Sequence, residues 1–409
     1  YIFLVKLVMN TETTRVLSAM RPNGRLHLGH YLGVLQNWQQ IQYQYKCFFM
    51  LADIHGLINN YHASQQLNET MHEMVIDWLA AGVDPSQATI FIQSRVPEHF
   101  ELANLLGVIT PLGWLERVPS YKDALDELEH TDGNTYGLLG SPLLQSADIL
   151  LYNSHYVITG EEQAANIELT REIARRFNHL FGREDGFEEK ASASIKKLGI
   201  KKAALYAKLL IKYQQEGNDE ALATARYLLQ DALNLSHGDR ERLFAFLENK
   251  GKVFLQEPHI LTGNSTRIIG TDGTQMSIAR NNTINIRDEP EVVSSKIRGM
   301  ITDPARVKRS DRGTPSSCPV WRLHQIYSTQ EVSNWVEMGC LSAGIGCLDC
   351  KQPLIDAINL QQHELIEKAK PYQEDSTLVK RILSDGCGRA REIASTNLKS
   401  IKQAMNIDY

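Results

Sequence analysis

A short stretch of the chain, residues 15–53, reads RVLSAMRPNGRLHLGHYLGVLQNWQQIQYQYKCFFMLAD. It opens with a short apolar run at Arg15–Ala19, turns at Pro-Asn-Gly, and continues as a helical pattern from about Leu28 to Tyr45. The continuous apolar run Cys47–Ala52 is typical of a strand that is buried on both faces of a parallel sheet. The stretch therefore predicts strand, turn, helix and strand, which is the repeating unit of an α/β fold.

The same alternation continues to about residue 183. The pattern predicts a helix at Ser64–Ala81, strands at Thr89–Gln93 and His155–Thr159, and a helix at Glu161–Asn178. The inward face of the last helix is expected to carry Ile167, Thr170, Ile173, Ala174 and Phe177. Strands that alternate with helices predict a doubly wound parallel α/β sheet, in which ligands bind beyond the carboxyl ends of the strands.

Residues 184–256 read as helix only. We expect one inward face with Leu205, Leu209, Leu210 and Tyr213, and another with Leu222, Ala225, Leu229, Ala232 and Leu233. The segment also carries six lysines near its start: Lys196, Lys197, Lys201, Lys202, Lys208 and Lys212. These lysines either form an ordinary solvated helix face or contact RNA. From about residue 292 the pattern is again mainly helical, and it ends in an amphipathic helix at Asp375–Met405.

Composition places the chain among ordinary globular proteins. The 409 residues are 43% hydrophobic and 22% charged, with a net charge of −5. These values exclude a disordered, collagen-like or polybasic protein, so binding of nucleic acid must use local basic patches. The apolar stretches are far shorter than the ~20 residues that span a bilayer. Tyr1–Val8 is too short for a signal peptide and lacks a cleavage site, so we expect a cytoplasmic location. Because the sequence starts with Tyr and not with Met, we expect Met9 to be the natural start and Tyr1–Val8 to be an extension.

The first candidate site is the turn Pro22-Asn23-Gly24-Arg25-Leu26-His27-Leu28-Gly29-His30, at the first strand-to-helix junction. Glycine lets a nucleotide approach the backbone, and the first N–H groups of a helix favour an anion. His27 and His30 can donate hydrogen bonds to the charge that builds on a transferring phosphoryl group. Alone, H-x-G-H is a weak signal, and a structural pair of histidines is its default interpretation. The position after the first strand of an α/β domain strengthens the alternative, a phosphate site.

Three further motifs contain residues that suit a small polar ligand. Asp148 stands alone in the apolar helical run Ser141–Tyr152. A buried carboxylate is costly without a partner, so Asp148 bonds either within the protein or to a ligand N–H. Gly160 and Gln163 lie where a strand ends and a helix opens, and Gln163 can both donate and accept, as an amino-acid head group requires. His55 follows the second strand, either as a ligand contact or as a structural histidine.

Four of the six cysteines follow the spacing C-x21-C-x6-C-x2-C: Cys318, Cys340, Cys347 and Cys350. The Cys347-x-x-Cys350 pair puts two thiolates within reach of one metal centre, and zinc and iron–sulfur clusters both use four such sulfurs. A Gly-rich turn at 344–346 would help the sulfurs to converge. The alternative is four unconnected free thiols. The other two cysteines, Cys47 and Cys387, are expected to be packing residues.

Taken together and in this order, the motifs resemble those of the tryptophanyl-tRNA synthetases, a family of class I aminoacyl-tRNA synthetases. Leu17–Trp38 resembles the family's S-G-x-x-P-T-G-x-L-H-L-G-x-Y, with His27-Leu28-Gly29-His30 as the HIGH signature. Pro142–Tyr152 resembles P-V-L-x-A-A-D-I-L-L-Y, and Val157–Asn178 resembles V-P-V-G-E-D-Q-x-x-H-x-E-L-T-R-x-I-A-x-R-F-N. The helix Ile382–Ala404 resembles the family's last helix, and the resemblance covers nearly the whole chain except 184–256. Tyrosyl-tRNA synthetases share the fold, but the run at 147–152 is similar to the tryptophan enzymes.

The resemblance implies a ligase that activates L-tryptophan with ATP and transfers it to tRNA(Trp). It implies a Rossmann-like catalytic domain at 9–183 and 257–291, a helical insertion at 184–256, and an α-helical anticodon-binding domain at 292–409. It also implies Mg²⁺ on the ATP phosphates, no membrane contact, and a homodimer formed through Arg117–Asp123 and the neighbourhood of Leu102–Trp114. The cysteine spacing is similar to that of a subgroup with a [4Fe–4S] cluster, and zinc is the alternative metal.

The same resemblance assigns roles to individual residues. The catalytic residues are expected to be His27, His30, Ser277 and Arg280. The ATP site is expected to use Pro22, Asn23, Gly24, His27, Gly29, His30, Gly160, Met276 and Ser277. The tryptophan site is expected to use His55, Gln145, Asp148 and Gln163, with Asp148 accepting the indole N–H.

The chain departs from the family pattern in three places. The loop Asp272–Asn282, which alone reads as a surface loop, has Gln275-Met276-Ser277-Ile278-Ala279 where the family has K-M-S-K-S, so Arg280 is the nearby cation. Ser141 stands where an aromatic side chain is expected beside the amino-acid ammonium group, and residues 184–256 replace a short connection. The missing lysines keep a second interpretation open, in which the chain is a non-enzymatic paralogue that senses tryptophan or RNA.

Overall fold

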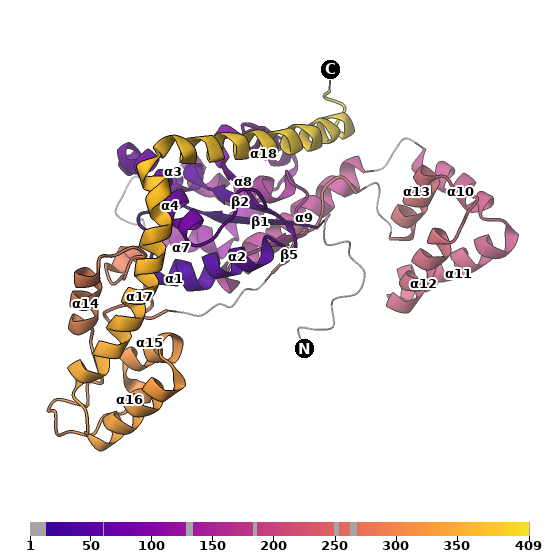
Figure 1. The fold of residues 1–409 in the computed structure, drawn as a ribbon. Helices are drawn as coiled ribbons and strands as arrows, with labels where there is room; N and C mark the ends of the chain where they lie inside the picture. The colour runs from indigo at the N-terminus through magenta and orange to yellow at the C-terminus, as the bar shows by residue number, and fades with distance from the viewer. Residues whose placement is uncertain are drawn as a thin grey trace. The chain divides into compact units, whose positions relative to one another are not determined.

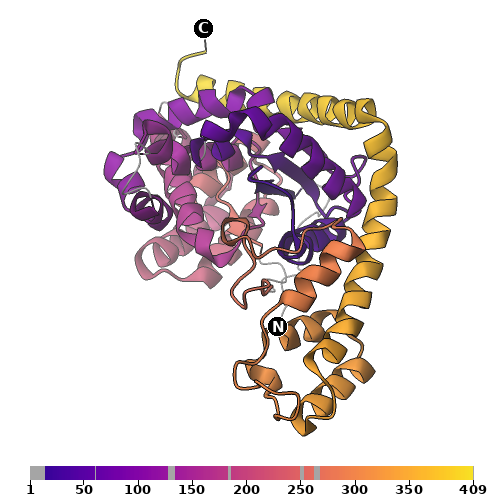
Figure 2. The same ribbon diagram turned by 90° about the vertical axis from the view of Figure 1, so that its left-hand side faces the viewer.

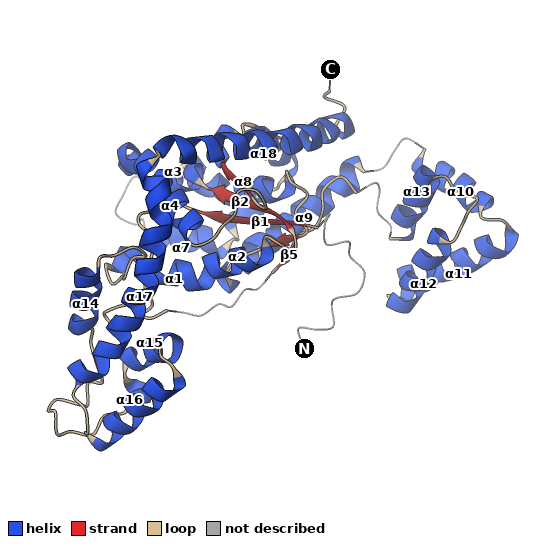
Figure 3. Ribbon diagram, in the orientation of Figure 1, coloured by secondary structure: helices blue, strands red, loops and turns tan. Residues whose placement is uncertain are grey.

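The computed structural model describes residues 14–59, 61–127, 134–182, 186–248, 253–261 and 268–408. The expectations for Tyr1–Val8 and Met9 lie outside these ranges. Helices predominate in the part of the chain that is described, and the strands are few (Figures 1 and 3). The chain divides into two compact units. The first comprises residues 1–95, 158–161 and 261–390, and the second comprises residues 96–157, 162–260 and 391–409.

The strands of the first unit are β1 (Arg15–Met20), β2 (Lys46–Leu51) and β3 (Thr89–Ile92), in the order β3-β2-β1. Both neighbouring pairs are parallel, and β1 and β2 are in register from Arg15 opposite Lys46. Every residue of β2 after Lys46 is buried. The expected buried parallel strands are therefore confirmed to within about one residue at each end.

The helices beside these strands are shorter than the sequence pattern predicts. The expected helix from Leu28 to Tyr45 consists of α1 (Leu28–His30), a π-helical turn η1 (Tyr31–Leu35) and α2 (Gln36–Ile41). It is followed by α3 (Asp53–Asn59), the 3₁₀ turn η2 (Tyr61–Gln66), α4 (Leu67–Ala80) and the 3₁₀ turn η3 (Gln93–Arg95). Trp38 of α2 stacks on Phe49 of β2 with ring centroids 4.0 Å apart, which fixes this helix on the sheet.

The C-terminal part of the first unit is helical, as expected. Its elements are η5 (Ile278–Arg280), α14 (Pro290–Gly299), η6 (Pro315–Ser317), α15 (Pro319–Tyr327), α16 (Gln330–Ser342), α17 (Cys347–Glu374) and the first half of α18 (Ser376–Ala404). The long helix α17 packs against α4, α14, α15 and α16 (Figure 2). Helix α18 approaches β3 closely, because the Ile92 N–H donates to Cys387 Sγ at 3.4 Å and a Cβ at Gly386 would overlap the carbonyl oxygen of Ile90.

The second unit contains a helical layer and two short strands. The helices are α5 (Glu98–Ile109), α6 (Leu112–Glu116), α7 (Pro119–Glu127), α8 (Tyr136–Leu150), α9 (Ala164–Phe181) and the end of α18, with the 3₁₀ turn η4 (Glu161–Gln163) before α9. The strands β4 (Tyr156–Val157) and β5 (His259–Ile260) pair in parallel. Helix α8 packs against both α5 and α9. The inward face predicted for α9 is confirmed, since all five of its residues are buried.

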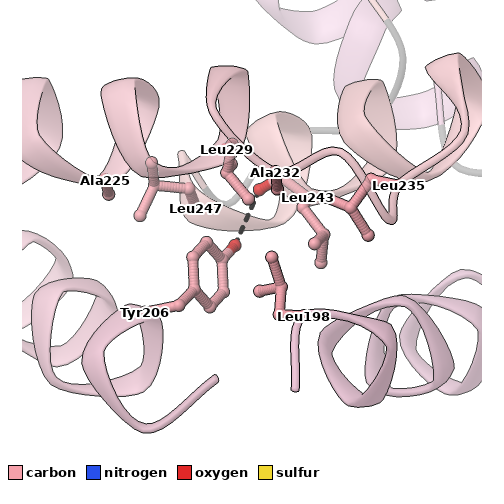
Figure 4. Close-up of a cluster of buried hydrophobic side chains, with 8 residues drawn as sticks. All are labelled: Leu198, Tyr206, Ala225, Leu229, Ala232, Leu235, Leu243 and Leu247. Atoms are coloured by element: carbon pink, nitrogen blue, oxygen red, sulfur yellow. Dashed lines mark hydrogen bonds between the residues drawn. The ribbon is translucent and has the colours of Figure 1, made fainter. Parts of the chain in front are cut away.

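The second unit also contains the all-helical segment, with α10 (Phe187–Lys197), α11 (Ile200–Glu216), α12 (Asp219–Gln230) and α13 (His237–Leu247). These four helices share a core of Leu198, Tyr206, Ala225, Leu229, Ala232, Leu235, Leu243 and Leu247 (Figure 4). The Tyr206 hydroxyl donates to the carbonyl oxygen of Leu243 at 2.7 Å, so its one polar atom is satisfied within the core.

Two residues were wrongly predicted to face this core. Leu205 is 44% exposed and Leu233 is 95% exposed. On α11 the inward position is taken by Tyr206, the neighbour of Leu205. Helix α12 ends at Gln230, so the helical spacing that was extended to Leu233 no longer applies there. None of the helices described in this structure is both long and apolar enough to cross a bilayer.

Candidate functional site

The turn Pro22–His30 follows the carboxyl end of β1, where parallel sheets place their ligand-binding loops. Backbone hydrogen bonds hold it from behind: the Leu28 N–H donates to Ile284 O at 3.0 Å, and the Ile286 N–H donates to Leu26 O at 2.9 Å. The side chain of Gln362 in α17 donates to Asn285 O at 2.8 Å and so holds the segment 284–286, which contacts the turn. The backbone that carries the two histidines of the turn is therefore held in place by hydrogen bonds.

His27 and His30 lie against each other at the start of α1, with ring centroids 3.9 Å apart. The Gly29 N–H donates to His27 Nδ1 at 3.1 Å, and the His27 N–H donates to His30 Nδ1 at 3.2 Å. Burial lowers the pKa of His27 to about 3, with a smaller contribution from the charge of His30, and burial lowers the pKa of His30 to about 4. Both rings are thus neutral near pH 7. Because Nδ1 accepts in each ring, Nε2 carries the proton, and the pair presents two N–H donors.

The loop that carries Met276 and Ser277 lies against this turn. Gly24 has a φ of +141°, and a Cβ at this position would lie 3.5 Å from Ile278 Cδ1. On its other side the turn meets α3, because a Cβ at Gly56 would lie 3.1 Å from Pro22 Cδ. The structure therefore brings together the two segments that were predicted to hold ATP.

Asn282 organises that loop, and sequence reasoning gave it no role. Its side chain is 2% exposed, and its amide group donates to Asp272 Oδ1 at 2.7 Å and to Gln275 O at 3.1 Å. Its oxygen accepts from the Ser277 N–H at 2.8 Å. The loop is therefore anchored in the unit, whereas the Arg280 side chain at the end of η5 is exposed.

Gly160 and His55 are the other two candidates in the first unit. The Ile158 N–H donates to Leu17 O at 3.1 Å, so the chain that leads to Gly160 extends alongside β1. His55 is buried on α3, which begins directly after β2. Both residues lie beyond the ends of strands, as predicted, and their roles in binding stay predictions.

Asp148 lies on α8 in the second unit and is 2% exposed. Its Oδ1 is 2.6 Å from His99 Nδ1, and His99 Nε2 is 2.8 Å from the Tyr152 hydroxyl. The intraprotein partner that a buried carboxylate requires is therefore His99, which sequence reasoning did not single out. This pairing leaves the proposed contact with a ligand N–H as a prediction.

Gln145 and Gln163 belong to a polar network in the second unit. Asn166, which is 4% exposed, donates to Gln145 Oε1 at 2.6 Å and to Gln163 Oε1 at 3.0 Å. The Ser120 hydroxyl donates to Asn166 Oδ1 at 3.1 Å. The two predicted glutamines thus come together, and Asn166, which was not predicted, fixes the oxygen of each.

The four cysteines of the predicted metal site lie at helix ends in the first unit and are free thiols. Cys318 precedes α15, Cys340 lies in the last turn of α16, and Cys347 and Cys350 lie in the first turn of α17. Burial, and then the charges of the other three cysteines, raise the pKa of Cys350 to about 12, so the four thiols share one neighbourhood. Within the described ranges, however, no three His, Cys, Asp or Glu side chains are grouped closely enough to hold a metal ion.

Known proteins resemble this chain over almost its whole length. The family described as tRNA synthetases class I (W and Y) matches residues 9–202 and 239–361. A tryptophan–tRNA ligase of Ralstonia nicotianae is 53% identical over 395 residues, which cover 97% of this chain and 99% of that protein. A tryptophan–tRNA ligase of Thermotoga maritima is 35% identical and covers 97% of this chain and 100% of that protein.

Solved structures agree with this fold. The tryptophanyl-tRNA synthetase of Campylobacter jejuni, complexed with ADP and tryptophan, superposes with a TM-score of 0.71 at 22% identity. The match covers 96% of this chain and 100% of that chain. The parallel strands, the histidine turn at the end of β1 and the sequence matches lead to one conclusion: the chain belongs to the class I tRNA synthetases of the tryptophan and tyrosine group.

Proposed function

We propose that this protein is a tryptophan–tRNA ligase, which activates L-tryptophan with ATP and transfers it to tRNA(Trp). The observation that carries the proposal is the pair of histidines at the end of β1, in which both Nδ1 atoms accept from backbone N–H groups, so that each Nε2–H is left to donate. In phosphoryl transfer, positioning and charge stabilisation supply most of the catalysis, and fixed N–H donors serve both. The relatives that carry the name tryptophan–tRNA ligase support tryptophan over tyrosine.

In the first step, the carboxylate of tryptophan attacks the α-phosphorus of ATP and pyrophosphate leaves. His27 and His30 donate through Nε2–H to the phosphate oxygens, while Gly24, Gly29 and Gly160 let the nucleotide approach the backbone. Mg²⁺, when bound, neutralises part of the phosphate charge. In the second step, a ribose hydroxyl of the terminal adenosine of the tRNA attacks the carbonyl carbon of tryptophanyl-adenylate, so that an ester forms, the acyl–phosphate bond breaks and AMP leaves.

In this mechanism the loop Met276–Arg280 closes over the leaving pyrophosphate. Met276 is buried, and the Ser277 N–H donates to the side chain of Asn282. Asn282 therefore fixes the backbone position of this part of the loop. Arg280 supplies the cation that the missing lysines would give, because an exposed guanidinium can reach phosphate oxygens bidentately. Pro22 and Asn23 form the facing side of the ATP site.

The amino acid is assigned to the residues around α8. Asp148 accepts the indole N–H, which can only donate. Gln163 uses its oxygen in the network with Asn166, so we assign its NH₂ group, together with Gln145, to the amino-acid end of tryptophan. The assignment of His55 to the same end rests on the family resemblance alone. A site built on the indole hydrogen bond disfavours side chains that lack the N–H, since they leave the buried carboxylate without it.

Tryptophan-dependent exchange of pyrophosphate into ATP tests the activation step. The proposal predicts exchange with tryptophan and much weaker exchange with tyrosine at the same concentration. The alternative, a sensor that binds tryptophan or RNA without chemistry, predicts tryptophan binding with no exchange. The ligase is favoured because relatives of that name cover 97% of this chain.

We further propose that the four cysteines hold a metal centre, either a [4Fe–4S] cluster or zinc. Two buried cations support it: Lys351 follows Cys350 directly in α17, and Arg306 Nη1 lies 3.9 Å from Cys340 Sγ. Four thiolates around one Zn²⁺ leave two negative charges, which two adjacent cations balance. The donor set therefore fits a tetrathiolate centre in its chemistry, although the sulfurs are not grouped as a closed site.

The spacing favours iron by resemblance alone, so the metal has to be measured. Anaerobically purified protein is predicted to be brown and to lose its colour in Cys347→Ser. Colourless protein with about one zinc per chain would contradict iron and keep the site. Four alkylatable thiols with no bound metal would contradict both metals.

The homodimer, the four-part domain division and the cytoplasmic location remain predictions. The dimer draws support from two exposed apolar side chains in the predicted interface, Val108 at 78% and Leu112 at 58% exposure. A mass near twice 46.2 kDa in solution would support the dimer. A monomeric mass at micromolar concentration would contradict it.

A further inference from the structure

Three side chains form a fully buried hydrogen-bonded chain in the second unit. His99 lies in the first turn of α5, Asp148 lies on α8, and Tyr152 follows α8 in the next turn. Their exposed fractions are 0%, 2% and 0%. The Asp148 Oδ1 to His99 Nδ1 distance is 2.6 Å, and the His99 Nε2 to Tyr152 hydroxyl distance is 2.8 Å.

The direction of these hydrogen bonds follows from the chemistry of the groups. An ionised carboxylate only accepts, so His99 Nδ1 donates to Asp148. A ring that carries its proton on Nδ1 alone accepts at Nε2, where the Tyr152 hydroxyl can donate to it. Tyr152 thus selects the tautomer of His99 that has a proton for Asp148. The two hydrogen bonds therefore act in sequence: Tyr152 orients the protons of His99, and His99 orients the carboxylate of Asp148.

The position of Asp148 explains why the orientation of its carboxylate matters for the proposed tryptophan site. Asp148 lies one helical turn after Gln145 on α8, so the two side chains share a face of the helix. Helix α5 packs on α8, and the His99–Asp148 bond joins them. The hydrogen bond from His99 restrains the plane of the Asp148 carboxylate, and with it the direction of any further hydrogen bond that the carboxylate accepts.

We propose that His99 is a positioning residue for tryptophan specificity, and that Tyr152 supports it through the tautomer. The proposal rests on the proposed function, in which Asp148 accepts the indole N–H. His99 donates to Asp148 and so orients its carboxylate toward the indole nitrogen, and it does not itself touch the substrate. The alternative is a purely structural ion pair that satisfies a buried carboxylate and has no effect on substrate choice.

The test compares two substrates that differ only at the indole nitrogen. One is tryptophan, and the other is its benzothienyl analogue, in which sulfur replaces the N–H. The readout is the ratio of kcat/KM values for tryptophan and the analogue in pyrophosphate exchange, with the KM for ATP measured alongside. Loosening of the pocket slows both substrates equally and leaves the ratio unchanged, whereas a misdirected acceptor lowers the ratio.

Three variants carry the test. In His99→Leu, which removes the donor, the ratio should fall at least tenfold while the KM for ATP changes less than twofold. In His99→Asn, the side-chain NH₂ stands near the position of Nδ1 and donates to Asp148, so the ratio should return to within about threefold of the wild type. In Tyr152→Phe, which frees the tautomer, the ratio should fall by a smaller factor than in His99→Leu.

The outcomes separate this proposal from the proposed function. A wild-type ratio in both His99→Leu and Tyr152→Phe overturns the positioning role, even when both variants are slower. If His99→Leu does not fold, the kcat/KM ratios of His99→Asn and Tyr152→Phe decide whether His99 has the positioning role. A lowered ratio in Tyr152→Phe together with a near wild-type ratio in His99→Asn supports the role. Any other result overturns it. A wild-type protein with no tryptophan-dependent exchange contradicts the proposed function instead.

Discussion

Replacing His30 separates its two hydrogen bonds and so tests how the histidine pair works. His30 Nδ1 accepts from the His27 N–H at 3.2 Å, and its Nε2–H is the proposed donor to phosphate. In His30→Asn, the amide oxygen takes the place of Nδ1 and can still accept from His27, but no donor reaches the Nε2 position. In His30→Gln, the amide NH₂ reaches the Nε2 position, and the acceptor for His27 is lost.

The two variants should therefore fail in different ways. Removal of one preorganised donor to a developing negative charge costs about 2.7–4 kcal/mol, a rate loss of about 10²–10³-fold. We expect this loss in adenylate formation for His30→Asn, with its melting temperature close to that of the wild type. His30→Gln should keep more of the rate and lose stability of about 0.5–1.5 kcal/mol, the contribution of one ordinary hydrogen bond.

Single-turnover formation of tryptophanyl-adenylate is the appropriate assay, because it reports the chemical step rather than product release. A wild-type rate in His30→Asn, or equal losses in the two variants, would refute the donor assignment. The pH profile adds a second check. With pKa values of about 3 and about 4, the two rings stay neutral above about pH 5.5 and should cause no inflection there. Imidazolium donors would instead make the rate fall as the pH rises through about 6.5.

Three further substitutions test other parts of the account. Asp148→Asn should raise the KM for tryptophan by roughly tenfold to a hundredfold, because a hydrogen bond to a charged group contributes about 1.5–3 kcal/mol; an unchanged KM in exchange kinetics would reject the indole contact. Arg280→Ala should slow adenylate formation more than tenfold, and an unaffected rate would mean that the loop acts through its backbone. Gly386→Ala should lower the free energy of unfolding by about 1–3 kcal/mol, because the added Cβ overlaps the carbonyl oxygen of Ile90. Gly388→Ala is the matched control, since a Cβ there has no neighbour within 4 Å, and equal urea midpoints for the two variants would contradict this packing.

The strands and the site loops could be predicted because their signals are local. The apolar run of β2 and the turn at Pro22–His30 are each contained in fewer than ten adjacent residues. The strand-end position of the histidines followed from the alternation of strands and helices alone. The inward face of α9 was predictable for the same reason, since a regular helix repeats its buried positions.

Residues that act through distant partners could not be predicted in this way. His99 and Asn166 reach side chains on other elements, and Asn282 closes its loop through backbone groups that no sequence pattern marks. The errors at Leu205 and Leu233 have other causes. On α11 the apolar neighbour Tyr206 fits the inward face as well as Leu205 does, and only packing decides between them. Leu233 lies beyond the end of α12 at Gln230, which the apolar pattern does not mark. The pKa shifts of His27 and His30 likewise depend on burial, which the sequence does not specify.

Charging of tRNA(Trp) tests the central claim most directly. Purified protein, ATP, Mg²⁺ and labelled tryptophan are incubated with a transcript of tRNA(Trp), and the labelled aminoacyl-tRNA is measured, with tyrosine and tRNA(Tyr) as the mismatched pair. The account predicts tryptophan on tRNA(Trp), no charging of the mismatched pair, and a loss of about a hundredfold or more in His30→Asn. Binding of tryptophan and tRNA(Trp) without any charged product would contradict the account and identify the protein as a sensor.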